Sequence, residues 1–347
     1  MRHSAYLLLT FVIEATAGQR SAVLTSAEQA AVARIQVDDL KGNLSFLSSD
    51  LLEGRATPSR GLDIAAEFIA SRFRMSGLEA VGDDGYYQTA DWPLRGDAPK
   101  TAKVRNVIGV LRGSDPKLKD TYIIVSAHYD HLGMKPEGSE GHRIYNGADD
   151  DGSGVVGVIE LANALRDSHL RRSIVFMTYF GEEKGDLGSN WYGKHPILPL
   201  EKTIANINLE QIGRTDDVEG PRVNELSMTG FDYSDLGAML NASCERAGIK
   251  VTKHPRNSDA FFFRSDNATL AGEGVVAHTV CTAFEFPDYH QVGDTWEKVN
   301  YDNEARVLKG LALRLLDLAN SDKEPTWSSD NPRAARYLKA WKDRHGG

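Results

Sequence analysis

The sequence contains only two cysteines, Cys244 and Cys281, in 347 residues. So few cysteines exclude a disulfide framework and a zinc site built from thiolates. One disulfide between these two residues stays open, because it requires Cα atoms within about 7 Å, and spacing along the chain does not set that distance.

The sequence also lacks a long apolar run and an excess of basic residues. No run approaches the roughly 20 apolar residues that span a bilayer, so we expect no membrane span. Lys and Arg number 40 against 49 Asp and Glu, which gives a formal net charge of −9. Because an acidic surface repels phosphate backbones, we expect no nucleic-acid partner. The oligomeric state does not follow from these numbers.

The N-terminus has the pattern of a secretory signal. Arg2 and His3 precede the apolar residues 5–13, and Ala15-Thr16-Ala17 then provides small residues of the kind that signal peptidase cleaves. We therefore expect a signal peptide over residues 1–17 and a secreted or periplasmic protein. A buried N-terminal helix or strand is the alternative.

Apolar patterns predict strands that alternate with helices. Short runs rich in β-branched residues are predicted strands: 104–111, 122–126, 174–179, 204–209 and 275–282. Apolar stripes at helical spacing lie within 62–73, 155–165 and 307–318. This alternation favours an α/β sandwich with a largely parallel, buried central sheet. With no Pro-, Gly- or Ser-rich linker, we expect one domain over residues 36–320 and a polar tail over 321–347, with a short helix after Pro332.

Polar residues that could carry chemistry follow two of the predicted strands and open one of the predicted helices. His128 comes after the second strand, with Asp130 two positions later; the acidic turn Asp149-Asp150-Asp151 opens the helix near residue 155; and Glu182-Glu183 follow the third strand. Each also has a purely structural interpretation. His128 could be a buried histidine without a ligand, the acidic turn could cap the helix N-terminus, and Glu182-Glu183 could lie on an exposed loop. Ligands, however, collect at the carboxyl ends of strands in such sheets.

Two further residues extend this set. Glu210 ends the fourth strand, and His290 lies in a turn that continues to Asp294 and Thr295. Two imidazoles and three carboxylates suit Zn²⁺ or a similar ion. One zinc would leave carboxylates unpaired, whereas two zincs that share one carboxylate use all five side chains.

The sequence resembles the co-catalytic zinc peptidases of the M28 clan, which include bacterial secreted aminopeptidases. The resemblance runs from about Leu40 to Asp317, and its motifs occur in order: 48–55, 128–130, 147–154, 182–183 and 289–295. It implies a single-domain three-layer α/β sandwich with a mixed, largely parallel central sheet flanked by helices. It also implies a metal-dependent hydrolase that acts on peptides.

Carried over residue by residue, the resemblance gives each side chain a role. It implies that Asp150 bridges two Zn²⁺ ions, with His128 and Glu210 completing one site and Glu183 and His290 completing the other. It implies further that Glu182 is the general base, that Tyr289 polarises the scissile carbonyl, and that Asp130 orients His128. The peptide bond Asp150–Asp151 is expected to be cis, with Asp151 also in a supporting position.

The sequence departs from the family pattern in the expected substrate pocket. Glu210 stands where most members have Asp, and Asn267 replaces a histidine after Ser265-Asp266. We expect these changes to alter the pocket and not the metal chemistry.

The interpretation that fits best is an aminopeptidase that removes N-terminal residues by metal-activated water. A carboxypeptidase or dipeptidase on the same scaffold is the main alternative and would need Arg264 or Arg256 to hold a substrate carboxylate. A glutaminyl-cyclase-like transferase keeps only one zinc, and an inactive binding module would have lost the base or a ligand. The sequence keeps all five predicted ligands and the predicted base Glu182, which argues against both the transferase and the binding module.

Overall fold

The computed structural model describes residues 23–94 and 100–346, so the predicted signal peptide lies outside the described residues. The strands are β1 (Glu79–Ala80), β2 (Tyr87–Leu94), β3 (Lys100–Leu111), β4 (Tyr122–His128), β5 (Gly133–Met134), β6 (Ile144–Tyr145), β7 (Ser173–Tyr179), β8 (Thr203–Leu209), β9 (Glu225–Met228), β10 (Lys250–Thr252) and β11 (Val276–Cys281). The helices are α1 (Ser26–Val32), α2 (Val37–Leu47), α3 (Arg60–Met75), α4 (Gly154–Leu165), α5 (Leu187–Lys194), α6 (Leu236–Cys244), α7 (Asn257–Ala260), α8 (Asn267–Gly272), α9 (Tyr301–Asn320) and α10 (Ala335–Arg344).

Within the described residues, nine strands form one mixed sheet. Its order is β1-β3-β7-β4-β8-β11-β9-β10, and β2 also pairs with β3. The four central strands β7, β4, β8 and β11 are parallel, whereas β3 and β9 run antiparallel to their central neighbours. Every residue of β4 and β7 is buried, as expected for strands covered on both faces. The carboxyl ends of the central strands therefore meet at one edge of the sheet.

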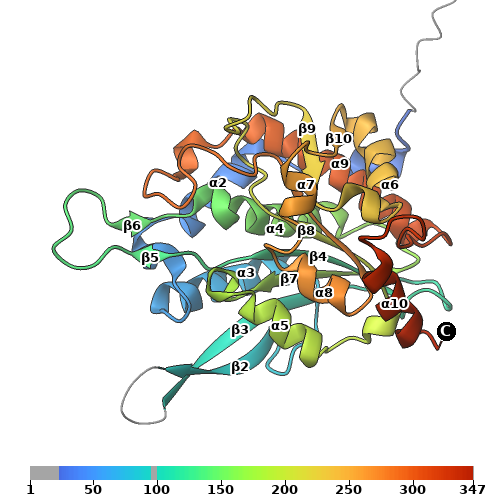
Figure 1. The fold of residues 1–347 in the computed structure, drawn as a ribbon, viewed down its shortest axis with the longest axis horizontal. Coiled ribbons are helices and arrows are strands. Elements are labelled where there is room, and N and C mark those ends of the chain that lie inside the picture. Colours follow the sequence, from blue (N-terminus) through green and yellow to red (C-terminus); the bar gives the residue numbers. More distant parts are fainter. Residues whose placement is uncertain (1–22, 95–99, 347) are drawn as a thin grey trace, which may run out of the picture.

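Helices cover both faces of this sheet. In Figure 1, α2, α4, α6 and α9 lie above the sheet, while α5, α8 and α10 lie below it. The stripe Leu62, Ala65, Ile69 and Phe73 of α3 is buried, which explains why this segment forms an amphipathic helix. Gly77 follows at φ +69°, and its N–H donates to the carbonyl of Arg74 just past the end of α3.

The three-layer α/β prediction is confirmed. All five predicted strands form, as β3, β4, β7, β8 and β11, and the helical stripes form α3, α4 and α9. The short helix expected after Pro332 is the ten-residue α10. The predicted polar tail packs on the domain, because Trp327 and Tyr337 are buried. The outer strands β1, β2, β9 and β10 of the sheet are additional to the prediction.

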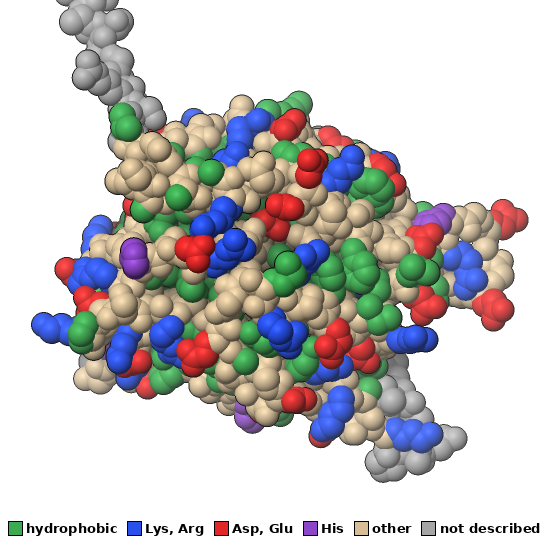
Figure 2. All heavy atoms as spheres, turned by 180° about the vertical axis from the view of Figure 1, so that it is seen from behind, with side chains coloured by type: hydrophobic (Ala, Val, Ile, Leu, Met, Phe, Trp, Pro, Cys, Tyr) green, Lys and Arg blue, Asp and Glu red, His purple; other side chains and the backbone are tan. Residues whose placement is uncertain are grey.

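The surface mixes charges of both signs. On the face shown in Figure 2, acidic and basic side chains are interspersed over the domain. None of the helices in the described part of the chain combines the length and the apolar character that crossing a membrane requires. Cys244 and Cys281 are buried and do not form a disulfide.

Candidate metal centre

Three parallel strands bring the predicted residues together. His128 is the last residue of β4 and lies in register with Tyr179 at the end of β7. Glu182 and Glu183 come after β7 with two residues between, and Glu210 directly follows β8. The N–H of Glu210 donates to the carbonyl of Val280, which keeps this residue against the end of β11.

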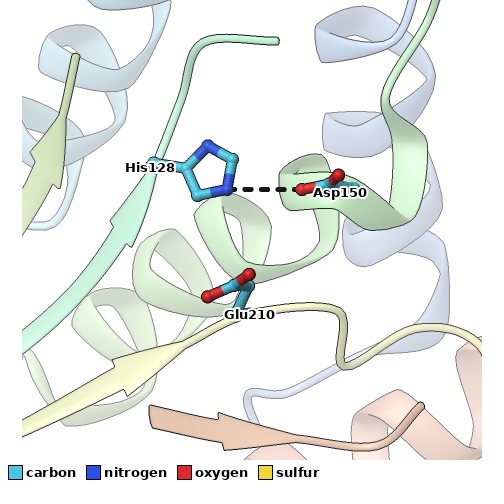
Figure 3. A group of neighbouring side chains, drawn as sticks. All are labelled: His128, Asp150 and Glu210. Carbon is cyan, nitrogen blue, oxygen red and sulfur yellow. Dashed lines mark ion pairs between the residues drawn. The ribbon is translucent and has the colours of Figure 1, made fainter. Parts of the chain in front are cut away.

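One group of three potential ligands contains His128, Asp150 and Glu210. One ligand atom from each lies within 4.8 Å of the others. Nε2 of His128 is 3.3 Å from Oδ1 of Asp150. Figure 3 shows the three side chains converging from the end of β4, the turn before α4 and the end of β8. We call this set the first ligand group.

A second group shares Asp150 and contains His131 and Glu183, again within 4.8 Å. His290 approaches the same carboxylates, with its Nε2 3.0 Å from Oδ2 of Asp150 and 3.4 Å from Oε2 of Glu183. We call His131, Asp150, Glu183 and His290 the second ligand group. The structure thus brings together all five predicted ligands.

His131 is the ligand-type residue that the sequence interpretation missed. Its signal was present in the run His128-Tyr129-Asp130-His131, which places a second imidazole directly past a buried strand. The side chain of His131 is fully buried.

Buried polar atoms without hydrogen bonds test whether a metal fits here. Nε2 of His128, Oδ2 of Asp150, Oε1 of Glu183 and Oε2 of Glu210 are all buried and make no hydrogen bond within the described part of the chain. Such atoms are costly unless something else satisfies them. Imidazole nitrogens and carboxylate oxygens are the donor set that zinc accepts. The residues present therefore fit two divalent cations that share Asp150.

The electrostatics of the site favour a cation as well. Although burial raises the pKa of Asp150, the adjacent imidazoles of His128 and His290 lower it far below its usual range. The adjacent carboxylates of Asp150 and Glu183 raise the pKa of His290 to about 10. Imidazolium groups are thus favoured next to these carboxylates, and a divalent cation would compete with their protons.

Asp130 and Asp151 support the strand ends instead of joining either ligand group. Oδ1 of Asp130 accepts the N–H of Glu182 at 3.0 Å and lies 3.6 Å from Nδ1 of His128. Oδ2 of Asp151 accepts the N–H of His128 at 3.1 Å, and its Oδ1 accepts the N–H of Gly154 at 3.0 Å. Both carboxylates therefore fix backbone near the ligands.

The turn that carries Asp150 is held by two other carboxylates. Asp294 accepts the N–H groups of Asp149 and Asp150, and Oδ1 of Asp149 accepts those of Gly213 and Arg214. The Asp150–Asp151 peptide bond is cis, as the family resemblance implied.

A buried arginine ties two of these loops together. Arg55 is 1% exposed. Its guanidinium donates to the carbonyls of Leu47, Tyr129, Asn146 and Gly147. This one side chain thereby joins the loop after β4 to the loop that leads to Asp150.

The predicted base and tyrosine lie beside the ligand groups. Oε2 of Glu182 is 3.8 Å from Nε2 of His128. Burial raises the pKa of Glu182 well above its usual range; His128 opposes this rise and Glu210 adds to it. Tyr289 stacks on His290 with ring centroids 4.0 Å apart. It also lines a small pocket with Glu210, Arg264 and Phe261.

Fold and site together define an α/β protein with two groups of carboxylate and imidazole ligands that share Asp150 at the ends of parallel strands. The sequence model of Peptidase family M28 matches residues 106–313. The chain belongs to this family.

Individual proteins agree with this assignment. A probable zinc metalloprotease of Pyrenophora teres f. teres is 24% identical over 326 residues, which cover 86% of this chain and 68% of that protein. Aminopeptidase YwaD of Bacillus subtilis is 32% identical over 138 residues, covering 40% of this chain and 28% of that protein. The structure of BSAP, a zinc aminopeptidase from Bacillus subtilis, superposes with a TM-score of 0.65 at 16% identity and covers 84% of this chain and 97% of that one.

Proposed function

We propose that this chain is a dizinc aminopeptidase that removes N-terminal residues from peptides. The observation that carries the proposal is the pair of ligand groups that share Asp150, with buried ligand atoms that make no hydrogen bonds. His128, Asp150 and Glu210 would hold one zinc, and Asp150, Glu183 and His290 would hold the other.

The chemistry divides between the metals and the protein. Two zinc ions bound there would lower the pKa of water and stabilise negative charge on a carbonyl oxygen. Glu182 accepts the proton of the attacking water and returns it to the leaving amine. Burial suits Glu182 to this task because it raises the pKa of the carboxyl well above its usual range, which helps the group to return the proton after taking it. Nearby zinc ions would oppose that rise and keep the carboxylate available as a base.

The charge of the site indicates which end of the peptide is cleaved. The carboxylate of Glu182 borders the ligand groups and that of Glu210 belongs to the first of them, and carboxylates attract an α-ammonium and repel an α-carboxylate. Asp149 and Asp151 do not face the substrate, because their side chains accept backbone N–H groups inside the protein. An aminopeptidase name on one curated relative supports the same direction.

The small pocket beside the ligand groups is the proposed place for the first side chain of the substrate. Tyr289 and Glu210 form its border with the ligand groups, and Phe261 and Phe284 contribute aromatic surface. From this position the hydroxyl of Tyr289 would donate a hydrogen bond to the scissile carbonyl and so polarise it. Asn267 lies outside this lining and is buried, with its Oδ1 accepting from the hydroxyl of Thr279.

A carboxypeptidase or dipeptidase is the second candidate because of Arg264. This exposed arginine lines the same pocket and lies over the ring of Phe261, 4.1 Å from its centroid. It could pair with a substrate carboxylate. Arg256, the other arginine considered, forms an ion pair with Glu219.

Blocked substrates separate the two candidates. We expect N-acetylation of a dipeptide or an amino-acyl anilide to abolish turnover and C-terminal amidation to change kcat/KM little. The opposite pattern would overturn the aminopeptidase proposal and favour a carboxypeptidase, with Arg264→Ala as the next variant.

We also propose that the enzyme is secreted or periplasmic, on the basis of the N-terminal sequence pattern. Mass spectrometry of protein exported from a bacterial host should give a mature chain that begins after Ala17. A chain that keeps its first 17 residues and stays in the cytoplasm would contradict this.

A further inference from the structure

His131 has a fixed and fully buried position next to the second metal site. Its backbone N–H donates to the carbonyl of Arg55. Its ring lies directly against Gly147, where a Cβ atom would come within 2.5 Å of Cγ of His131. Gly147 has φ +55°, so the backbone there also favours glycine. The ring therefore has little freedom to move away.

The ring nitrogens of His131 lie close to carboxylate oxygens without making hydrogen bonds to them. Nδ1 is 2.8 Å from Oε1 of Glu183 and 3.9 Å from Oδ2 of Asp150. Nδ1, Nε2 and both of these oxygens make no hydrogen bond within the described residues. Three buried ligand atoms that approach each other in this way can all be satisfied by one cation.

His290 approaches the same two carboxylates with its own imidazole. Its ring meets that of His131 edge to face, with centroids 5.9 Å apart. The side chain of His290 is 38% exposed and that of His131 is fully buried. The two imidazoles thus flank Asp150 and Glu183, one from the protein interior and one from the surface.

We propose that His131 is a ligand of the second zinc, in addition to Asp150, Glu183 and His290. This inference rests on the proposed dizinc function and adds a fourth protein ligand to one of its two sites. The second site then has two imidazoles and two carboxylates, whereas the first has one imidazole and two carboxylates. Because imidazole is a good zinc ligand, the extra imidazole should make the second site hold its zinc more tightly than the first.

Substitution of His131 tests the proposal through metal binding. We expect His131→Asn and His131→Ala to lower zinc affinity at one of the two sites by at least about tenfold, because losing even an outer partner of a ligand costs about 10–100-fold. Competition with a chelator, followed by elemental analysis, measures this. His142→Ala is the matched control, since His142 lies in the segment between β5 and β6, is half-exposed and contacts Asp50 outside both ligand groups.

Two measurements keep the test valid if a variant folds poorly. Circular dichroism and thermal unfolding show whether each variant retains the fold. X-ray absorption on the wild-type protein loaded with zinc counts imidazoles without any substitution: the proposal predicts three imidazoles shared between two ions, and a merely structural His131 predicts two.

The outcomes separate this inference from the proposed function. If the wild-type protein binds no zinc, the proposed function fails. If it binds two zincs and hydrolyses peptides, but His131→Asn keeps both affinities and only two imidazoles are counted, the ligand role of His131 alone is wrong.

Discussion

The backbone N–H of Glu182 donates to the carboxylate of Asp130, which also lies beside the ring of His128. The other oxygen of Asp130 accepts the hydroxyl of Thr57. One buried carboxylate therefore positions both a metal ligand and the proposed base. We expect Asp130→Ala to reduce both zinc affinity and kcat by about 10–100-fold. Zinc titration and steady-state kinetics measure this; native values for both would contradict the positioning role.

Glu182→Gln should separate catalysis from metal binding. Glutamine keeps the size of the side chain but cannot take a proton. We expect kcat to fall about 10²–10⁴-fold while zinc content is unchanged. Glu140→Gln, a neutralisation on an exposed loop, is the control and should leave kcat as it is. Near-native kcat of Glu182→Gln with both zincs bound would show that another group is the base.

Arg55→Met should destabilise the whole domain. Methionine fills part of the volume but removes the Arg55 donor from four buried carbonyls, of which that of Gly147 still accepts the N–H of Gly152. An unsatisfied buried group costs about 1–3 kcal/mol, so we expect a loss on the order of 3 kcal/mol or more after partial relaxation. Urea unfolding gives the value, with the exposed Arg60→Met as control. A loss no larger than that of the control would refute this view of Arg55.

Glu160 predicts a pH dependence of stability. It lies on α4, where its Oε1 accepts from Nδ2 of Asn43, and burial raises its pKa to about 7. Between its ordinary value of 4.5 and about 7 the folded protein binds more protons at this site than the unfolded chain, so its contribution to stability falls as pH rises through that window.

Glu160→Gln removes this titration. When the pH is raised from 5 to 8, the wild type should lose more free energy of unfolding than the variant. The difference should be on the order of 2 kcal/mol, at 1.36 kcal/mol per pKa unit. Denaturant unfolding of both proteins at the two pH values measures the difference. An equal stability change on raising the pH in wild type and variant would mean that the pKa of Glu160 is not raised.

The central sheet could be predicted because its strands are buried on both faces and therefore read as continuous apolar runs. The polar residues after these runs could be predicted to meet, since parallel strands place their carboxyl ends at one edge. This reasoning reached His128, Glu183 and Glu210 directly from the sequence.

Residues whose position depends on distant segments could not be predicted in this way. The outer strands β9 and β10 are only four and three residues long and carry little periodicity. Nothing in the local sequence distinguishes Arg55 from an exposed charged residue. Its role depends on the carbonyls of Leu47, Tyr129 and Gly147, which only the fold brings to its side chain. His131 belongs to the same short run as His128, but only the fold brings Glu183 against its ring.

The number of zinc ions per chain is the most direct test of the proposal that Asp150 bridges two zinc ions. Elemental analysis of protein purified without chelator, with peptidase activity measured on the same sample, should give two zincs per chain. We also expect the Asp150→Ala variant to lose both zinc ions, because both sites use the carboxylate of Asp150. A reproducible value near one zinc per chain at full activity would contradict the bridging role of Asp150.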